Sequence, residues 1–227
     1  MKIKAVIFDL FGTLVDTFNA QEHKQILSEM ASSLSLPKDP FYDLWSSSFN
    51  KRALGVFKTL EESIIFIGKE LNVPINKSGI EQAIRIRINY TKKALVPRDD
   101  AIETVKQLIN LGFKIGLISD CTFEVPLIWD TTSLAPYFDS VIFSCSVGMK
   151  KPDPRIYRLA CKKLKVKPKN CFYIGDGSSR ELSGALHVGM FPVLIRSPFE
   201  KDSVRYDEDD WSDRRISSLS EILTYFN

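Results

Sequence analysis

The amino-acid sequence predicts an α/β fold in which a parallel sheet is interrupted, after its first strand, by an inserted helical bundle. The chain of 227 residues opens with an apolar run that has the character of a buried strand. Residues 17 to about 95 show helical patterns only, whereas residues 97–227 alternate short apolar runs with helical segments. Such alternation is typical of parallel sheets with crossover helices. We therefore expect a core domain of residues 1–16 and 96–227, and an inserted helical domain of residues 17–95.

The first predicted strand ends in an acidic side chain. Apolar residues 5–8 lead directly into Asp9, and Gly12 follows where the backbone needs a tight turn. In open α/β sheets the carboxyl ends of the strands carry the binding and catalytic groups. A carboxylate held there on a rigid element can act as a nucleophile, so Asp9 is the first candidate catalytic residue.

The inserted domain is predicted to hold four helices. Pro37, Pro40, Gly55 and Pro74 interrupt the helical pattern and separate its segments. Four helices joined by short loops make a small bundle. We expect these helices at residues 19–33, 41–52, 59–71 and 79–93.

The last part of the chain supplies the other strands and the crossover helices. Gly112 and Gly189 end two helical patterns, and Pro154 opens a third. Right-handed crossovers through these helices would bring the strands into one parallel sheet. We expect strands at residues 114–119, 140–144, 171–174 and 192–195, and helices at residues 100–111, 154–164 and 180–188.

Composition narrows the classes of function. With 44% hydrophobic and 26% charged residues, the chain has the make-up of an ordinary globular protein. Its net charge of +3 is spread along the chain rather than gathered in a stripe, so we expect no nucleic-acid partner. No apolar stretch approaches membrane-spanning length, so we expect no membrane partner. The four cysteines lack metal-site or disulfide-scaffold spacing, which favours a cytoplasmic location.

Polar residues follow two of the later strands. Ser119 ends the strand at residues 114–119, where its hydroxyl and the next backbone N–H groups could hold an anionic oxygen. Lys151 lies in the loop after the strand at residues 140–144, and Pro152 and Pro154 stiffen that loop. A restrained ammonium group in this position would neutralise an anion.

Two further carboxylates follow the strand at residues 171–174. Asp176 comes directly after the strand, and Glu181 falls in the first turn of the next helix. Because the carboxyl ends of parallel strands meet at one edge of the sheet, both should lie near Asp9. Clustered carboxylates of this kind indicate Mg²⁺.

These four segments, in this order, resemble the haloacid dehalogenase (HAD) superfamily. Its signature is an Asp nucleophile, a Ser or Thr, a Lys and a closing acidic pair, which correspond here to Asp9, Ser119, Lys151, and Asp176 with Glu181. The resemblance spans nearly the whole chain. It implies a hydrolase with a Rossmann-like core and a type 1 helical cap inserted after the first strand.

The resemblance also implies a role for each matching residue. Asp9 would form a covalent aspartyl intermediate that water later hydrolyses. Ser119 and Lys151 would bind the transferred anionic group, and Thr13 would complete the shell around it. The Mg²⁺ ligands would then be Asp9, the backbone carbonyl of Phe11, Asp176 and Glu181.

Phe11 is the main departure from the phosphatase pattern of this superfamily. Phosphatases usually carry a second Asp two residues after the nucleophile, and Phe11 cannot transfer a proton. The carbonyl of Phe11 remains available to the metal, but general acid–base help, typically worth about 10²–10⁴-fold, is lost. Asp120, which follows Ser119, could bind substrate and act as a substitute proton donor.

Because Phe11 stands where phosphatases usually carry Asp, a dehalogenase is an alternative function. The L-2-haloacid dehalogenases of the superfamily carry an aromatic residue, usually Tyr, where this chain has Phe11. Halide leaves without protonation, and Arg52 in the cap could receive it. Against this alternative, those enzymes bind no metal and lack the acidic pair formed by Asp176 and Glu181.

We therefore expect a Mg²⁺-dependent phosphohydrolase that acts on a small phosphorylated metabolite through an aspartyl-phosphate. The first alternative is a metal-free 2-haloacid dehalogenase, and the second is a ligand-binding or regulatory protein with little turnover. In either enzymatic case the partner is a small-molecule substrate, and the protein would be a monomer or a homodimer.

Overall fold

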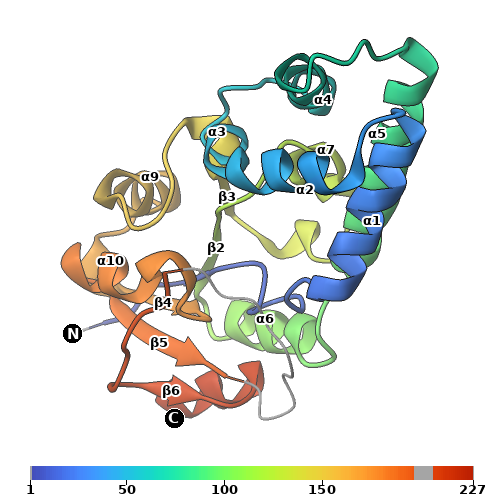
Figure 1. The fold of residues 1–227 in the computed structure, drawn as a ribbon. Helices are drawn as coiled ribbons and strands as arrows, with labels where there is room; N and C mark the ends of the chain where they lie inside the picture. The colour runs from blue at the N-terminus through green and yellow to red at the C-terminus, as the bar shows by residue number, and fades with distance from the viewer. Residues whose placement is uncertain (1, 197–206, 227) are drawn as a thin grey trace.

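The sheet of the protein is parallel throughout. The computed structural model describes residues 2–196 and 207–226, and within these ranges six strands form one sheet in the order β3-β2-β1-β4-β5-β6 (Figure 1). Every neighbouring pair is parallel, which confirms the predicted α/β class. The strands are β1 (Ala5–Phe8), β2 (Lys114–Ser119), β3 (Ser140–Phe143), β4 (Cys171–Gly175), β5 (Phe191–Ile195) and β6 (Arg215–Ile216).

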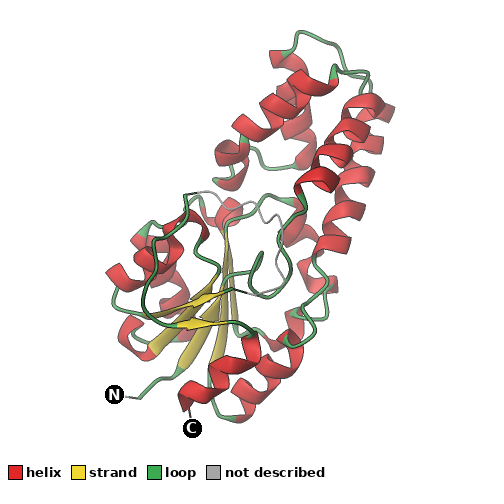
Figure 2. Cartoon of the chain, turned by 60° about the horizontal axis from the view of Figure 1, so that its bottom comes forward, coloured by secondary structure: helices red, strands yellow, loops and turns green. Residues whose placement is uncertain are grey.

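Helices cover both faces of the sheet (Figure 2). Alternate residues of β1 point to opposite faces. Val6 and Phe8 belong to one apolar cluster, which includes residues of α6. Ala5 and Ile7 belong to a second cluster, which includes residues of α9 and α10. This two-sided packing is the Rossmann-like arrangement, and its helices are α6 (Ala101–Asn110), α7 (Glu124–Ile128), α8 (Ser144–Val147), α9 (Pro154–Leu164) and α10 (Glu181–His187).

The segment between β1 and α6 is helical and stands apart from the sheet in Figure 2. It has its own apolar cluster, which includes Phe41, Trp45 and Ile64. None of the helices in residues 2–196 and 207–226 has the length and apolar character needed to cross a membrane. That residues 17–95 form a separate domain stays a prediction. The helices of the segment are α1 (Ala20–Ser33), α2 (Lys38–Ser47), α3 (Phe49–Ala53), α4 (Leu60–Glu70) and α5 (Lys77–Ala94).

The expectation of a single helix at residues 41–52 was wrong. The helix is interrupted at Ser48, whose hydroxyl donates to the carbonyl oxygen of Leu44 at 2.5 Å. Side chains of this kind compete with the helical hydrogen-bond ladder. The strand expected at residues 140–144 also ends early, because Ser144 begins α8 and its hydroxyl accepts from the backbone N–H of Cys121 at 3.0 Å.

The register of the sheet places the predicted site residues at one edge. Phe8 pairs with Leu117 of β2 and with Ile174 of β4. The backbone N–H of Asp9 continues this pairing and donates to the Ile174 carbonyl at 2.8 Å. Asp9 therefore lies between the ends of β2 and β4, which lead into Ser119 and Asp176.

The backbone of the helical segment lies close to the backbone of α8 at Gly55. The φ angle of Gly55 is +68°, and a Cβ atom added there would lie 2.0 Å from the carbonyl oxygen of Cys145 in α8. Any side chain at this position would have to push the two backbones apart. The segment that carries Arg52 is thus held directly against α8.

We predict that Gly55→Ala destabilises the protein more than Gly112→Ala. Both glycines have positive φ, but a Cβ at Gly112, where φ is +86°, would meet nothing within 4 Å. Gly112→Ala should cost about 1 kcal/mol through backbone strain alone, and Gly55→Ala about 1–3 kcal/mol more through overpacking. Urea unfolding of both variants measures the difference, and equal costs would show that the Gly55 contact does not hold the segment.

Candidate active site

Asp9 is buried at the end of β1, with 5% of its surface exposed. The ammonium group of Lys151 donates to Asp9 Oδ1 at 2.5 Å. The Thr13 hydroxyl lies 3.5 Å from Asp9 Oδ2, at the limit of a hydrogen bond. The backbone N–H of Lys151 donates to Asp120 Oδ1 at 3.1 Å, which ties the lysine loop to the end of β2. The structure thus brings the predicted nucleophile and the predicted cation into contact.

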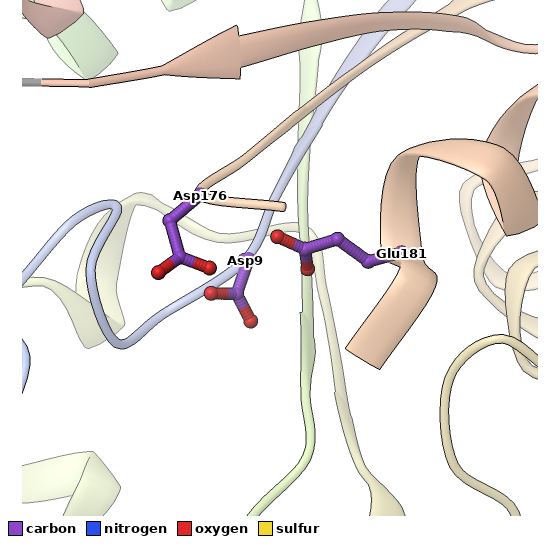
Figure 3. A group of neighbouring side chains, drawn as sticks. All are labelled: Asp9, Asp176 and Glu181. Carbon is purple, nitrogen blue, oxygen red and sulfur yellow. The ribbon is translucent and has the colours of Figure 1, made fainter. Parts of the chain in front are cut away.

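Three buried carboxylates gather at this point (Figure 3). Asp9, Asp176 and Glu181 each offer an oxygen, and these oxygens all lie within 4.8 Å of one another. Glu181 accepts from the Lys151 ammonium at 2.6 Å and from the Tyr173 hydroxyl at 2.8 Å through Oε2. The side chains come from β1, from the turn after β4 and from the start of α10. The predicted convergence of these three acids is therefore observed.

Gly12 lets the turn after Asp9 approach Asp176. Its φ angle is +77°, and a Cβ atom added there would lie 2.5 Å from Asp176 Oδ2. The peptide group between Phe11 and Gly12 is consequently held near the acidic cluster. The assignment of the Phe11 carbonyl as a metal ligand stays a prediction.

Burial and neighbouring charges shift the pKa values of the groups in the acidic cluster. Burial raises the pKa of Asp9 to about 6, Lys151 opposes this shift, and Asp176 adds to it. Burial also raises the pKa of Glu181, as does the neighbouring Asp9. Burial disfavours the charged form of Lys151, but Asp9 and Glu181 outweigh it and raise the pKa of Lys151. Asp9 and Glu181 thus share the Lys151 ammonium, and together with Asp176 they form a set of oxygen donors that fits Mg²⁺.

The end of β2 presents two polar atoms that face no partner. Ser119 is fully buried, and its hydroxyl oxygen has no hydrogen-bond partner within residues 2–196 and 207–226. Asp120 Oδ2 is likewise buried without a partner among those residues. Burial raises the pKa of Asp120, against the opposing charge of Lys151. Both groups are available to a ligand beside Lys151.

Arg52 lies in α3, outside the acidic cluster. Only 4% of its surface is exposed, and its guanidinium centre lies 4.1 Å from the centroid of the Trp45 ring. Its Nη1 donates to the Trp45 carbonyl and to the Ser48 hydroxyl, both at 2.7 Å. A role for Arg52 in substrate binding stays a prediction.

A buried ion pair that was not predicted from the sequence, Arg87 with Glu124, joins the helical segment to α7. Arg87 Nε donates to Glu124 Oε1 at 2.7 Å and thereby joins α5 to α7. A signal for it existed, because Arg87 falls on the same helical stripe as the buried residues Ile80, Ala83 and Tyr90. A charged residue on an apolar stripe indicates a buried partner.

Comparisons with known proteins agree with this geometry. A glyceraldehyde 3-phosphate phosphatase from Methanopyrus kandleri is 32% identical over 57% of this chain and 56% of its own length. A phosphatase of the same name from Methanocaldococcus jannaschii is 25% identical over 97% of this chain and 96% of its own. The crystal structure of a 2-haloacid dehalogenase from Pseudomonas syringae superposes with a TM-score of 0.73 at 21% identity, covering 99% of this chain and 98% of that one.

The family comparison covers β1 to β4, the inserted helices and the carboxylate cluster. The family model for haloacid dehalogenase-like hydrolases matches residues 3–189, which include Asp9, Ser119, Lys151, Asp176 and Glu181. Because this match extends over more than half of the chain, the chain belongs to the haloacid dehalogenase-like hydrolases.

Proposed function

We propose that the protein is a Mg²⁺-dependent phosphohydrolase that acts on a small phosphorylated metabolite through an aspartyl-phosphate. The observation that carries this proposal is the buried cluster of Asp9, Asp176 and Glu181, in which Asp9 and Glu181 pair with the Lys151 ammonium. A dianionic phosphoryl group can approach a carboxylate nucleophile only where cations offset the repulsion. The names of the two archaeal relatives, both phosphatases, support the same conclusion.

The side chains of the site have complementary tasks in this proposal. Asp9 attacks phosphorus and forms a P–O bond as the bond to the leaving oxygen breaks. The Lys151 ammonium and the Ser119 hydroxyl hold the oxygens of the transferring group. Water then attacks phosphorus, releases phosphate and regenerates the Asp9 carboxylate. Bound by Asp9, Asp176, Glu181 and the Phe11 carbonyl, Mg²⁺ would supply positive charge to the transferring phosphoryl group.

Asp120 takes the place of the missing general acid. Phe11 carries no proton to give, whereas Asp120 lies next to Ser119 and holds its Oδ2 buried and unpartnered within the described ranges. Burial raises the pKa of Asp120, which favours the protonated carboxyl that a proton donor requires. The leaving oxygen would take this proton as the bond to phosphorus breaks, and water attacking the aspartyl-phosphate would return it.

A metal-free 2-haloacid dehalogenase is the second candidate. The aromatic side chain of Phe11 favours it, because halide needs no proton donor. Asp176 and Glu181 weigh against it, because two further buried carboxylates beside Asp9 serve no step in halide displacement. The cytoplasmic location and the monomeric or homodimeric state stay predictions.

We predict that Asp176→Asn lowers Mg²⁺-dependent release of phosphate from p-nitrophenyl phosphate by about 100-fold or more, because a metal ligand that offsets charge is lost. Steady-state phosphate assays with Mg²⁺ or with chelator measure the effect. Asp9→Asn controls for contaminating phosphatases, and Asp210→Asn, at an exposed acid, controls for a simple change of charge. Chloride release from a 2-haloacid in chelator, without phosphate release, would favour the second candidate instead.

We further predict that Asp120→Asn slows hydrolysis of alkyl phosphates by about 10²–10⁴-fold but has little effect on p-nitrophenyl phosphate, whose leaving group needs no proton. Asn keeps an acceptor for the Lys151 backbone N–H, so the loop should stay in place. Phe11→Asp in the same protein should restore part of the loss. Equal losses on both substrates would argue that Asp120 only positions the loop.

A further inference from the structure

A second cluster of charged side chains lies between the helical segment and the sheet domain. It contains His23 of α1, Arg52 of α3, Arg87 of α5 and Glu124 of α7. Both arginines lie near the Trp45 ring. The guanidinium centres of Arg52 and Arg87 are 4.1 and 5.6 Å, respectively, from the centroid of this ring. The ribbon shows the elements that meet here, with α7 beside α5 (Figure 1).

Positive charge exceeds negative charge in this second cluster. Arg52 and Arg87 are 4% and 6% exposed, and Glu124, at 1%, pairs with Arg87. Burial lowers the pKa of Arg52 to about 9, with Glu124 opposing the shift and Arg87 adding to it. Burial, then Arg87 and Arg52, lower the pKa of His23 to about 4, so this imidazole is neutral near pH 7. Two buried guanidinium groups are therefore compensated by one carboxylate.

Three nitrogen atoms of the second cluster lack hydrogen-bond partners. Arg52 Nε, Arg87 Nη1 and His23 Nδ1 are buried, and none of them bonds to any atom of the described residues. Leaving a charged donor buried and unpaired is costly, and native proteins seldom do so without a ligand or water. The three nitrogens come from three different helices, and both guanidinium groups lie near enough to His23 to lower its pKa.

Aromatic contacts connect this second cluster to the turn that follows Asp9. The ring of Phe11, two residues after Asp9, lies 4.6 Å from the ring of Phe18. Phe18 in turn lies 5.9 Å from the Arg87 guanidinium and 5.8 Å from the His23 ring. Glu124 follows Asp120 by four residues, at the start of α7. The aromatic layer formed by Phe11 and Phe18 thus extends from the turn after Asp9 to the second cluster.

We propose that Arg52, Arg87 and His23 form a receptor for a carboxylate on the substrate, separate from the phosphoryl group that Asp9 attacks. The proposal rests on the phosphohydrolase function above and names its substrate class, a short phosphomonoester that also carries a carboxylate. Guanidinium groups match the geometry of a carboxylate, and the unpaired Nε and Nη1 atoms supply the donors. The rings of the aromatic layer would make apolar contacts with the short carbon chain between the phosphate and the carboxylate of the substrate.

Matched substrates test this proposal. Phosphoglycolate carries the carboxylate, 2-hydroxyethyl phosphate replaces it with a neutral alcohol, and ethylene glycol bisphosphate replaces it with a second phosphate. We expect the Mg²⁺-loaded enzyme to have a kcat/KM for phosphoglycolate about 10- to 100-fold above that for the alcohol, the range expected for charged hydrogen bonds. Equal values, or a preference for the bisphosphate, would overturn the assignment of a carboxylate.

Substitutions locate the receptor. Arg52→Gln should abolish the preference for phosphoglycolate over the alcohol, and so should Arg87→Gln combined with Glu124→Gln, which leaves no unpaired buried carboxylate. Lys51→Gln and Arg85→Gln, at exposed neighbours on the same helices, should keep the preference. Circular dichroism checks the folding of each variant. A preference that survives in a folded Arg52→Gln protein would overturn the proposal.

A binding measurement separates this inference from the proposed function. If no phosphomonoester is turned over, the phosphohydrolase function fails, but calorimetric binding of phosphoglycolate to the Asp9→Asn protein still tests the receptor. Binding that is tighter than that of the alcohol and is lost with Arg52→Gln supports the receptor. Binding that is equal for both ligands, or no binding at all, overturns it.

Discussion

The arrangement of the site depends on the ammonium group of Lys151. This group bonds to Asp9 and to Glu181, which are 172 positions apart in the sequence but meet at one edge of the sheet. Without this cation, the buried carboxylates of Asp9 and Glu181 would repel each other in a region that water reaches poorly. Asp120 in turn fixes the loop that carries Lys151, because it accepts a hydrogen bond from the backbone N–H of Lys151. Lys151 thereby connects the ends of β1 and β2 to the start of α10.

The strands, helices and site residues that could be predicted from the sequence are those that depend on neighbouring residues in the chain. The strand at residues 114–119 and the helix at residues 154–164 were predicted with their observed bounds, because apolar runs, proline and strand length are local signals. Asp9, Asp176 and Glu181 could be predicted to converge because parallel strands share a carboxyl edge.

The features that were missed depend on tertiary contacts. The pairing of Arg87 with Glu124 joins residues 37 positions apart on elements whose relative placement no local pattern specifies. The break at Ser48 follows from a hydroxyl that bonds to its own helix, which the sequence permits but does not require. The burial of Arg52 against Trp45 likewise needs the packing of α2 on α3. Local signals therefore predicted the acidic cluster and Lys151, whereas the contacts of Arg52 and Arg87 depend on the fold.

The ion pair between Arg87 of α5 and Glu124 of α7 affects how much free energy it would cost to move these two helices apart. An apolar contact resists opening because it exposes hydrocarbon to water, whereas an opened ion pair gains the hydration of two full charges. At Arg87 and Glu124 the loss of attraction on opening is largely offset by that hydration. Opening this contact would therefore cost less net free energy than opening an apolar contact of the same size.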